Sequence, residues 1–268
     1  MSRYAALFSE LKAKQEAAYI PFVLLGDPNP NDSLAIIKTL VDAGADALEL
    51  GIPFSDPLAD GPTIQSAALR ALAHNTTTEV CFELIHSVRL AYPNLPIGLL
   101  VYAHLIYRPG LDAFYARCQT AGVDSVLIAD VPMEESDAFR ISAEQHGIEQ
   151  IYICPPNASA QLIQSIAQKG KGYTYLLSRA GVTGAQDEAH MPLDHILAQL
   201  KLANTPPAVL GFGISRPEQV RAACAAGVAG VISGSAVVNL IEKNLDNPQK
   251  MLAELAIFTR DMKAATQS

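Results

Sequence analysis

The strongest constraint on the fold is a short phrase that recurs along the chain. It reads AGADALELG at 43–51, AGVDSVLIAD at 121–130 and AGVAGVISG at 226–234, with a weaker copy, HGIEQIYIC, at 146–154. Each copy combines a helix end, a glycine suited to the left-handed position that terminates helices, and a short apolar strand. A helix-to-strand connection that repeats in this way predicts β/α units around a parallel sheet.

Counting such units gives eight candidate strands. They are Ile20–Leu25, Ala47–Gly51, Ile97–Tyr102, Ser125–Ala129, Gln150–Ile153, Tyr173–Leu177, Ala208–Phe212 and Gly230–Ser233. Helices are predicted within the first 15 residues and near 32–43, 63–73, 78–92, 111–121, 135–146, 160–169, 193–201, 217–226, 236–243 and 248–264. Eight strands in a chain of this length favour an α/β fold of the (β/α)8 (TIM) barrel type, with an extra N-terminal helix and additional helices after the second and eighth strands.

An open, doubly wound sheet is the alternative architecture. The G-x-G-x-x-G turn that such sheets often place after the first strand is absent, because this chain continues with GDPNPND. No linker or change of composition divides the chain, so residues 1–268 are predicted to form a single barrel domain.

Composition excludes several classes of function. Hydrophobic residues make up 50% of the chain and charged residues 17%, which allows a sizeable core. The net charge of −8 and the lack of lysine or arginine runs argue against a nucleic-acid surface. No apolar run reaches the ~20 residues of a membrane helix, and the N-terminus does not read as a signal peptide. The four cysteines form no C-x-x-C pair and are predicted to be buried thiols in a reducing cytoplasm.

Residues 47–62, which read ALELGIPFSDPLADGP, combine a buried strand with a loop rich in proline and acids. Leu48 and Leu50 share one face of the strand, and Glu49 points to the other. If both faces are covered, the Glu49 carboxylate lies in an apolar interior, which is costly unless it is paired, protonated or functional. Active sites of (β/α)8 barrels lie where the strands end, so we predict the chemistry here.

Two glycine-containing turns predict a phosphate site. GFGIS at 211–215 and ISGSA at 232–236 end the last two strands and lead into helices, where backbone N–H groups of barrels often bind phosphate. The predicted ligands are Gly213, Gly234 and Ser235. The alternative is a pair of tight turns in which serines cap the helices.

The remaining polar motifs are less informative. The connection SRAGVTGAQDEAHMP at 178–192 is the longest after a strand and is predicted to be a lid, with a merely mobile loop as the alternative. Asp27 and Asp130 end strands, where turn or capping roles explain them equally well. Four histidines, which lie on helices or their ends without metal-site spacing, are His74, His86, His146 and His195.

Together these motifs resemble the tryptophan synthase α chain family. The matching strings are PF-LLGDP (21–28), ELGIPFSDPLADGP (49–62), ADVP-EES (129–136), ICPPN (153–157), YLLSRAGVTG (175–184) and GFGIS (211–215), in the family's order. The resemblance implies a lyase that cleaves indole-3-glycerol phosphate to indole and glyceraldehyde 3-phosphate without a metal or cofactor of its own. It also implies a β-chain partner, which carries pyridoxal phosphate and receives the indole through a tunnel in an α2β2 complex.

The same resemblance implies roles for individual residues. Glu49 would be the general acid and base, and Asp60 the carboxylate near the indole N–H, over which Thr183 would close. The indole pocket would be lined by Phe22, Leu100, Leu127, Tyr175, Phe212 and Ile232, and the phosphate would be held by Gly184, Gly213, Gly234 and Ser235. Asp56 would belong to the β-chain surface.

One position departs from the family pattern. After Tyr102 the family often has asparagine followed by leucine or proline, whereas this chain reads AHL and carries His104. This position is predicted to lie in a loop that faces the β chain. His104 would then alter the partner surface without affecting the chemistry, and simple drift is the alternative.

The reaction explains why two acids are needed. Protonation of the indole at C3 makes the ring electron-poor, and the side-chain hydroxyl must lose its proton as the carbon–carbon bond breaks. One buried carboxyl group that arrives protonated can perform both transfers, which suits Glu49. An ionised carboxylate at the ring N–H, which suits Asp60, stabilises the positive charge.

Two other functions fit part of the sequence. Another phosphate-binding barrel, such as an indole-glycerol-phosphate synthase or a phosphoribosyl isomerase, is the nearer one. A synthase is expected to carry a lysine on a strand near its site, and none of the predicted strand ends has one. A catalytically silent barrel kept as a regulatory subunit is the second, and the presence of both Glu49 and Asp60 argues against it.

Overall fold

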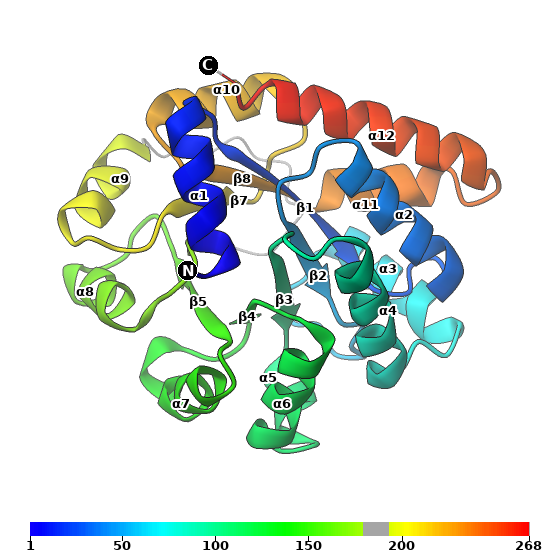
Figure 1. Cartoon of the computed structure of the whole chain (residues 1–268), viewed down its shortest axis with the longest axis horizontal. Helices are drawn as coiled ribbons and strands as arrows, with labels where there is room; N and C mark the ends of the chain where they lie inside the picture. Colours follow the sequence, from blue (N-terminus) through cyan, green and yellow to red (C-terminus); the bar gives the residue numbers. More distant parts are fainter. Residues whose placement is uncertain (179–192, 268) are drawn as a thin grey trace.

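The computed structural model describes residues 1–178 and 193–267, in which eight parallel strands form a closed barrel in sequence order (Figure 1). The strands are β1 (Ala18–Leu24), β2 (Leu48–Gly51), β3 (Ile97–Val101), β4 (Ser125–Ile128), β5 (Glu149–Cys154), β6 (Thr174–Leu177), β7 (Ala208–Gly211) and β8 (Gly230–Ser233). β1 and β8 close the barrel through pairs that run from Ala18–Gly230 to Pro21–Ser233. The predicted (β/α)8 architecture is confirmed, and the open-sheet alternative is wrong.

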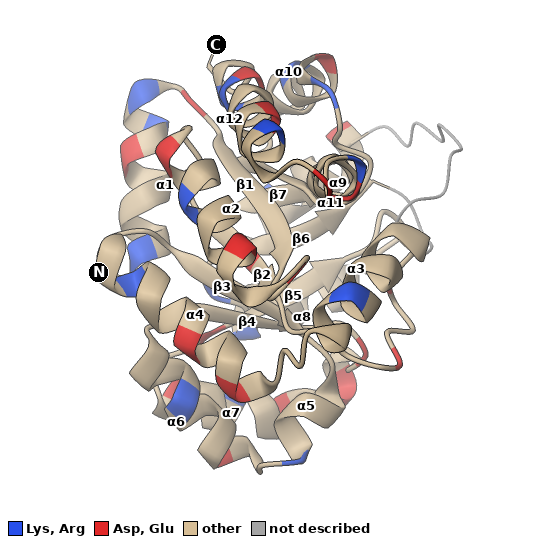
Figure 2. Ribbon diagram, turned by 90° about the vertical axis from the view of Figure 1, so that its right-hand side faces the viewer, with Lys and Arg blue, Asp and Glu red and all other residues tan. Residues whose placement is uncertain are grey.

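Helices surround the barrel, and charged residues of both signs lie on these helices and on the connections (Figure 2). The helices are α1 (Arg3–Lys14), α2 (Pro30–Asp42), α3 (Pro62–Ala73), α4 (Thr78–Ala91), α5 (Ala103–Tyr107), α6 (Leu111–Ala121), α7 (Asp137–Gln145), α8 (Ala160–Lys169), α9 (Leu193–Leu202), α10 (Pro217–Ala226), α11 (Ser235–Lys243) and α12 (Pro248–Ala264), with a 3-10 turn, η1, at Met133–Glu135. The additional helices predicted after the second and eighth strands are present as the pairs α3–α4 and α11–α12.

The short helix α5 was not predicted from the sequence. The segment was expected to be a loop, but the structure places His104 within α5, with its side chain exposed. Five residues are too few to show a helical period, so the sequence pattern could not reveal this element. The Asp130 carboxylate stabilises the start of α5 by accepting a hydrogen bond from the Ala103 N–H at 2.8 Å. The loop prediction at His104 is therefore corrected, and a capping role for Asp130 is confirmed.

Helix α1 lies over the end of the barrel where the strands begin (Figure 1). Its Tyr4 is fully buried, with its ring 5.4 Å from that of Tyr173, and the Ser125 hydroxyl donates to the Tyr4 hydroxyl at 3.1 Å. Gly98, which pairs with Glu49, leaves the necessary space, because a Cβ there would lie 2.9 Å from the Tyr4 oxygen. The helix thus places a tyrosine beneath the acid of β2.

An ion-pair cluster lies at the same end of the barrel. Asp124 contacts Arg3 and Arg89, each at 2.7 Å, and the side chains of Arg89 and Asp124 are each 10% exposed. The Ile97 N–H also donates to Asp124 at 2.8 Å. Each oxygen of this carboxylate therefore has a cationic partner.

Three of the four cysteines are buried, as predicted. Cys81, Cys118 and Cys154 are buried, Cys224 is half-buried, and all four are free thiols. Within the described ranges, no helix has both the length and the apolar character to span a membrane, and no group of histidine, cysteine or acidic side chains could hold a metal ion.

Candidate active site

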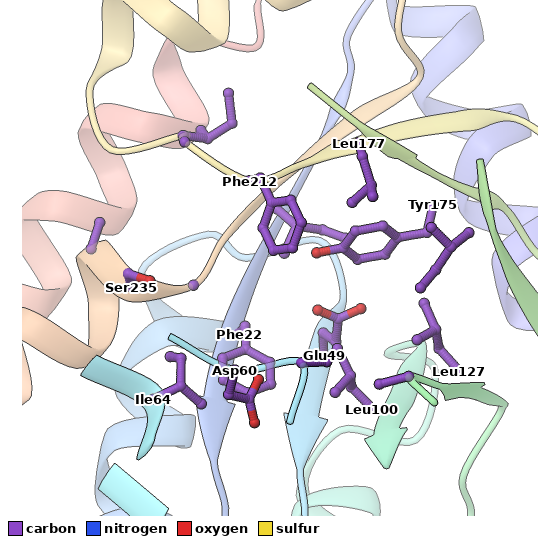
Figure 3. A pocket seen from close by; sticks show the side chains of 18 of the residues that line it. Phe22, Glu49, Asp60, Ile64, Leu100, Leu127, Tyr175, Leu177, Phe212 and Ser235 are labelled. Carbon is purple, nitrogen blue, oxygen red and sulfur yellow. The ribbon is translucent and has the colours of Figure 1, made fainter. Parts of the chain in front are cut away.

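A cavity of about 420 Å³, within the range of small-molecule sites, lies at the end of the barrel where the strands finish (Figure 3). Eleven residues predicted for catalysis or substrate binding line it, namely Phe22, Glu49, Asp60, Leu100, Leu127, Tyr175, Phe212, Gly213, Ile232, Gly234 and Ser235. Two others, Thr183 and Gly184, lie outside the described residues, as does the predicted lid beyond Ser178.

Strand register brings the apolar wall of the cavity together. Leu100 pairs with Leu127 across β3 and β4, and Ile153 pairs with Tyr175 across β5 and β6. Because inward-facing positions repeat every second residue, the wall continues along these strands. The sequence prediction missed nine lining residues, which are Ala59, Ile64, Ala129, Ile153, Leu177, Ile214, Ser215, Ala236 and Asn239. Three of them, Ala129, Ile153 and Leu177, could have been found from the period of two.

Glu49 enters the cavity from β2 and is only 2% exposed. Burial raises the pKa of its carboxyl group from 4.5 to about 8, and a hydrogen bond from the Tyr173 hydroxyl, at 3.1 Å from Oε1, opposes that rise. Glu49 is therefore largely protonated at neutral pH. Its burial was predicted from the strand pattern. Tyr173 was missed, because sequence spacing does not reveal which residues meet across a closed barrel.

Asp60 reaches the same cavity from the loop between β2 and α3. Burial raises the pKa of its carboxyl group from 3.8 to about 6, and a hydrogen bond from the Tyr102 hydroxyl opposes the rise. Asp60 is thus mostly ionised at pH 7, whereas Glu49 is mostly protonated. Two acids held in different protonation states in one cavity can combine proton transfer with the stabilisation of positive charge.

Tyr175 and Phe212 lie on the opposite side of the cavity from Asp60 (Figure 3). The Tyr175 ring occupies the space over Gly211, where a Cβ would lie 2.3 Å from the ring. Phe212 adopts a left-handed backbone conformation with φ of 67°, which is strained for a bulky residue. The backbone strain at Phe212 is thus located at the cavity, and no feature of the GFGIS string indicated it.

The two predicted phosphate turns differ in structure. At the start of α10, the N–H groups of Ser215 and Arg216 already donate to the Gln219 side chain, at 2.9 and 3.0 Å. Helix α11 begins at Ser235 after Gly234, which provides no side-chain cap. Neither serine occupies an N-cap position, so the alternative of serine caps is wrong. The open N-terminus that remains for an anion belongs to α11.

No lysine or arginine of residues 1–178 and 193–267 lines the cavity. Among these described residues, the groups that could hold an anion are backbone N–H groups and hydroxyl groups. The lysine expected of an indole-glycerol-phosphate synthase is not among the described lining residues either, so this alternative has no support from the site.

The two residues predicted for the partner surface lie outside the cavity. Asp56 is exposed on the loop between β2 and α3 and accepts a hydrogen bond from Ser55 at 2.5 Å. On the same loop, Leu58 is 84% exposed. His104 is exposed on α5, and its ring lies 6.0 Å from that of Phe54.

Asp27 has a role that its strand-end position did not reveal. It is buried and forms two hydrogen bonds with the Arg70 guanidinium, at 2.7 and 3.0 Å. Arg70 also contacts Glu242 of α11 at 2.8 Å. These contacts connect the turn after β1 to α3, which follows Asp60, and to α11, which begins at Ser235.

Comparison with known proteins identifies the family. The model of the family "Tryptophan synthase alpha chain" matches residues 8–267. The tryptophan synthase alpha chains of Vibrio cholerae and Yersinia pseudotuberculosis are 62% and 60% identical to this chain, and each match covers 100% of both chains. The crystal structure of tryptophan synthase subunit alpha from Legionella pneumophila has a TM-score of 0.90 at 32% identity, covering 99% of this chain and 98% of that chain. The chain therefore belongs to the tryptophan synthase α chain family, whose members cleave indole-3-glycerol phosphate and deliver indole to the β chain of an α2β2 complex.

Proposed function

We propose that this chain carries out the α reaction with Glu49 as the group that transfers both protons and Asp60 as the carboxylate that stabilises the ring. The observation that carries this assignment is the placement of two acids, with pKa values of about 8 and about 6, in one largely apolar cavity. In this family, pyridoxal phosphate belongs to the β chain and the α chain has no cofactor of its own. We also propose that residues 1–268 form a single barrel domain and that the protein is located in the cytoplasm.

One carboxyl group can account for both proton transfers of the reaction. Glu49 donates its proton to C3 of the indole ring, and Asp60 accepts a hydrogen bond from the ring N–H as positive charge develops. The Glu49 carboxylate then removes the proton of the side-chain hydroxyl. The carbon–carbon bond breaks as the aldehyde forms, and the bonding electrons return to the ring. Indole and glyceraldehyde 3-phosphate leave, and Glu49 is again protonated.

The rest of the cavity suits the remainder of the substrate. The apolar side chains Phe22, Leu100, Leu127, Tyr175, Phe212 and Ile232 would contact the indole ring. Gly213, Gly234 and Ser235 would hold the phosphate, where the uncapped start of α11 supports the assignment. Contact of Thr183 with Asp60 and of Gly184 with the phosphate stays a prediction. Asp56 and His104 would face the β chain, since both are exposed and neither lines the cavity.

Indole release from indole-3-glycerol phosphate tests the proposal. The purified chain is assayed alone and with a β chain, and Glu49→Gln and Asp60→Asn are compared with the wild type. We expect Glu49→Gln to lower kcat by roughly 10²- to 10⁴-fold, because its shape is kept while proton transfer is lost. Activity should be greatest between pH values of about 6 and about 8, where Asp60 is ionised and Glu49 is protonated.

Two controls make the result specific. Glu83→Gln removes an exposed acid of α4 and should leave kcat unchanged. Asp60→Asn should weaken catalysis strongly but bind glycerol phosphate almost as well as the wild type does. Near-normal turnover of Glu49→Gln contradicts the proton-transfer assignment, and a collapse of glycerol phosphate binding in Asp60→Asn means that Asp60 shapes the site instead.

A further inference from the structure

Tyr102 contacts the acid-bearing loop through its hydroxyl group. It follows β3 directly and is 3% exposed. The hydroxyl accepts a hydrogen bond from the Ala59 N–H at 3.1 Å and donates one to the Asp60 carboxylate. A single side chain from β3 thus binds the backbone of the loop and its acid at adjacent residues.

The ring of Tyr102 contacts the other end of the same loop. It stacks on Phe54, with ring centroids 5.3 Å apart and planes inclined by 27°. Phe54 in turn lies beside the exposed ring of His104. The loop between Phe54 and Asp60 is therefore held at its start by ring stacking and at its end by two hydrogen bonds.

This contact matters because Asp60 lies on a loop and not on a strand. A catalytic group must be held within roughly 0.5 Å of its working position, and a proline-rich loop without regular structure does not do so by itself. Among the described residues, three other ionisable groups lie near the pair. Glu49 lines the cavity with Asp60, Tyr175 lies on its opposite side, and Asp130 acts on Tyr102 from the β4 side. None of these three groups is cationic, and the Tyr102 hydroxyl favours the ionised form of Asp60 by donating a hydrogen bond to it.

We propose that Tyr102 is a positioning residue for the α reaction, which holds the loop between Phe54 and Asp60 in place and aims the Asp60 carboxylate into the cavity. This inference rests on the proposed role of Asp60. Tyr102 itself is absent from the cavity lining, so it acts through Asp60 and not on the substrate.

The test compares Tyr102→Phe with the wild type by indole release across pH. This variant keeps the ring stacked on Phe54 and loses only the hydroxyl. We expect kcat to fall by roughly 10- to 100-fold, the range for loss of a hydrogen bond to a charged group, with KM changed little. The acid limb of the pH profile should move to higher pH, because the Asp60 carboxylate has lost the donor that favours its ionised form.

Three further variants separate positioning from simple packing. Tyr107→Phe, on α5 and 57% exposed, is the matched control and should behave as the wild type. Phe54→Leu removes the ring stack but keeps the hydroxyl, and it should lower kcat without moving the acid limb. In the double variant Tyr102→Phe/Asp60→Asn, the two losses should not add, because the hydroxyl acts through the carboxylate.

The outcomes distinguish this inference from the proposed function. If Asp60→Asn turns over normally, the role of Asp60 itself is wrong. If Asp60→Asn is impaired but Tyr102→Phe keeps both its kcat and its acid limb, Tyr102 has no positioning role. Additive losses in the double variant also overturn the inference, because they place the effect of Tyr102 elsewhere.

Discussion

Asp124 at one end of the barrel and the two acids of the cavity at the other end are held in opposite ways. Where the strands begin, Asp124 contacts Arg3 and Arg89 and is balanced by positive charge. Where the strands finish, Glu49 and Asp60 face apolar walls, and the described lining of the cavity contains no lysine or arginine. Their hydrogen-bond partners are the tyrosine hydroxyls of Tyr173 and Tyr102.

This difference in surroundings distinguishes an acid that belongs to the scaffold, Asp124, from the acids of the proposed active site. Removing one partner of a buried ion pair is costly, because it leaves the other charge without compensation. A carboxyl group surrounded by apolar side chains keeps its proton to a higher pH at a cost in stability. The mouth of the barrel therefore contains a proton donor and a proton acceptor near neutral pH, whereas Asp124 lies between two cations.

The largest expected effect is a pH-dependent gain of stability in Glu49→Gln. Between pH 5 and pH 8 the unfolded chain has released the Glu49 proton, whereas the native chain retains it because its pKa is about 8. The free energy of unfolding of the wild type should then fall by about 3–4 kcal/mol as pH rises through this window, and glutamine removes the titration. Urea denaturation at pH 5 and pH 8 measures the difference, with Glu83→Gln as the control. A stability difference that does not change with pH contradicts the prediction.

At the opposite end, Asp124→Asn should lower stability at neutral pH by about 3 kcal/mol, because it leaves Arg89 buried without its anionic partner. The folded variant should keep its kcat, since the change lies far from the cavity mouth. Urea denaturation and the indole assay check both statements. Asp112→Asn, which breaks the exposed pair with His146, is the control and should cost less than about 1 kcal/mol. A loss of kcat in folded Asp124→Asn would show that the two ends are not independent.

The smallest effect is expected for Tyr173→Phe, which removes the hydrogen bond to Glu49. The pKa of Glu49 should rise, because burial then acts without the opposing donor. The basic limb of the kcat/KM profile should therefore move to higher pH, with a stability change of about 1 kcal/mol. In Tyr102→Phe the acid limb should move instead. The two pH profiles together would therefore assign Tyr173 to Glu49 and Tyr102 to Asp60. A basic limb that stays in place in Tyr173→Phe removes this assignment.

Much of the fold was predictable because local patterns carry it. Copies of the repeated phrase mark four of the eight strands, β2, β4, β5 and β8, and Gly230–Ser233 was predicted with its observed bounds. Glu49 was predicted to be buried because its neighbours Leu48 and Leu50 alternate with it. These features depend on residues close together in the sequence, where side-chain periodicity is a direct signal.

The missed features depend on residues that meet only after the barrel closes. Tyr173 and Glu49 are 124 positions apart, and Tyr102 reaches Asp60 from a neighbouring strand end. The pairing of Asp27 with Arg70 and the capping of α10 by Gln219 are likewise side-chain contacts without a sequence period. Sequence pattern therefore located the acids but not the hydroxyl donors that oppose the rise of their pKa values.

The pairing of β1 with β8 also has a consequence for synthesis. The barrel cannot close until Gly230–Ser233 has been made, about 200 residues after Ala18–Leu24. At a translation rate of about 5–20 residues per second, one edge of β1 waits roughly 10–40 s for its partner. During that interval the nascent chain exposes unpaired backbone N–H and C=O groups, which can pair with other chains. The finished barrel has no such edge. Aggregation through unpaired strand edges is therefore a risk for the ribosome-bound chain and not for the folded protein.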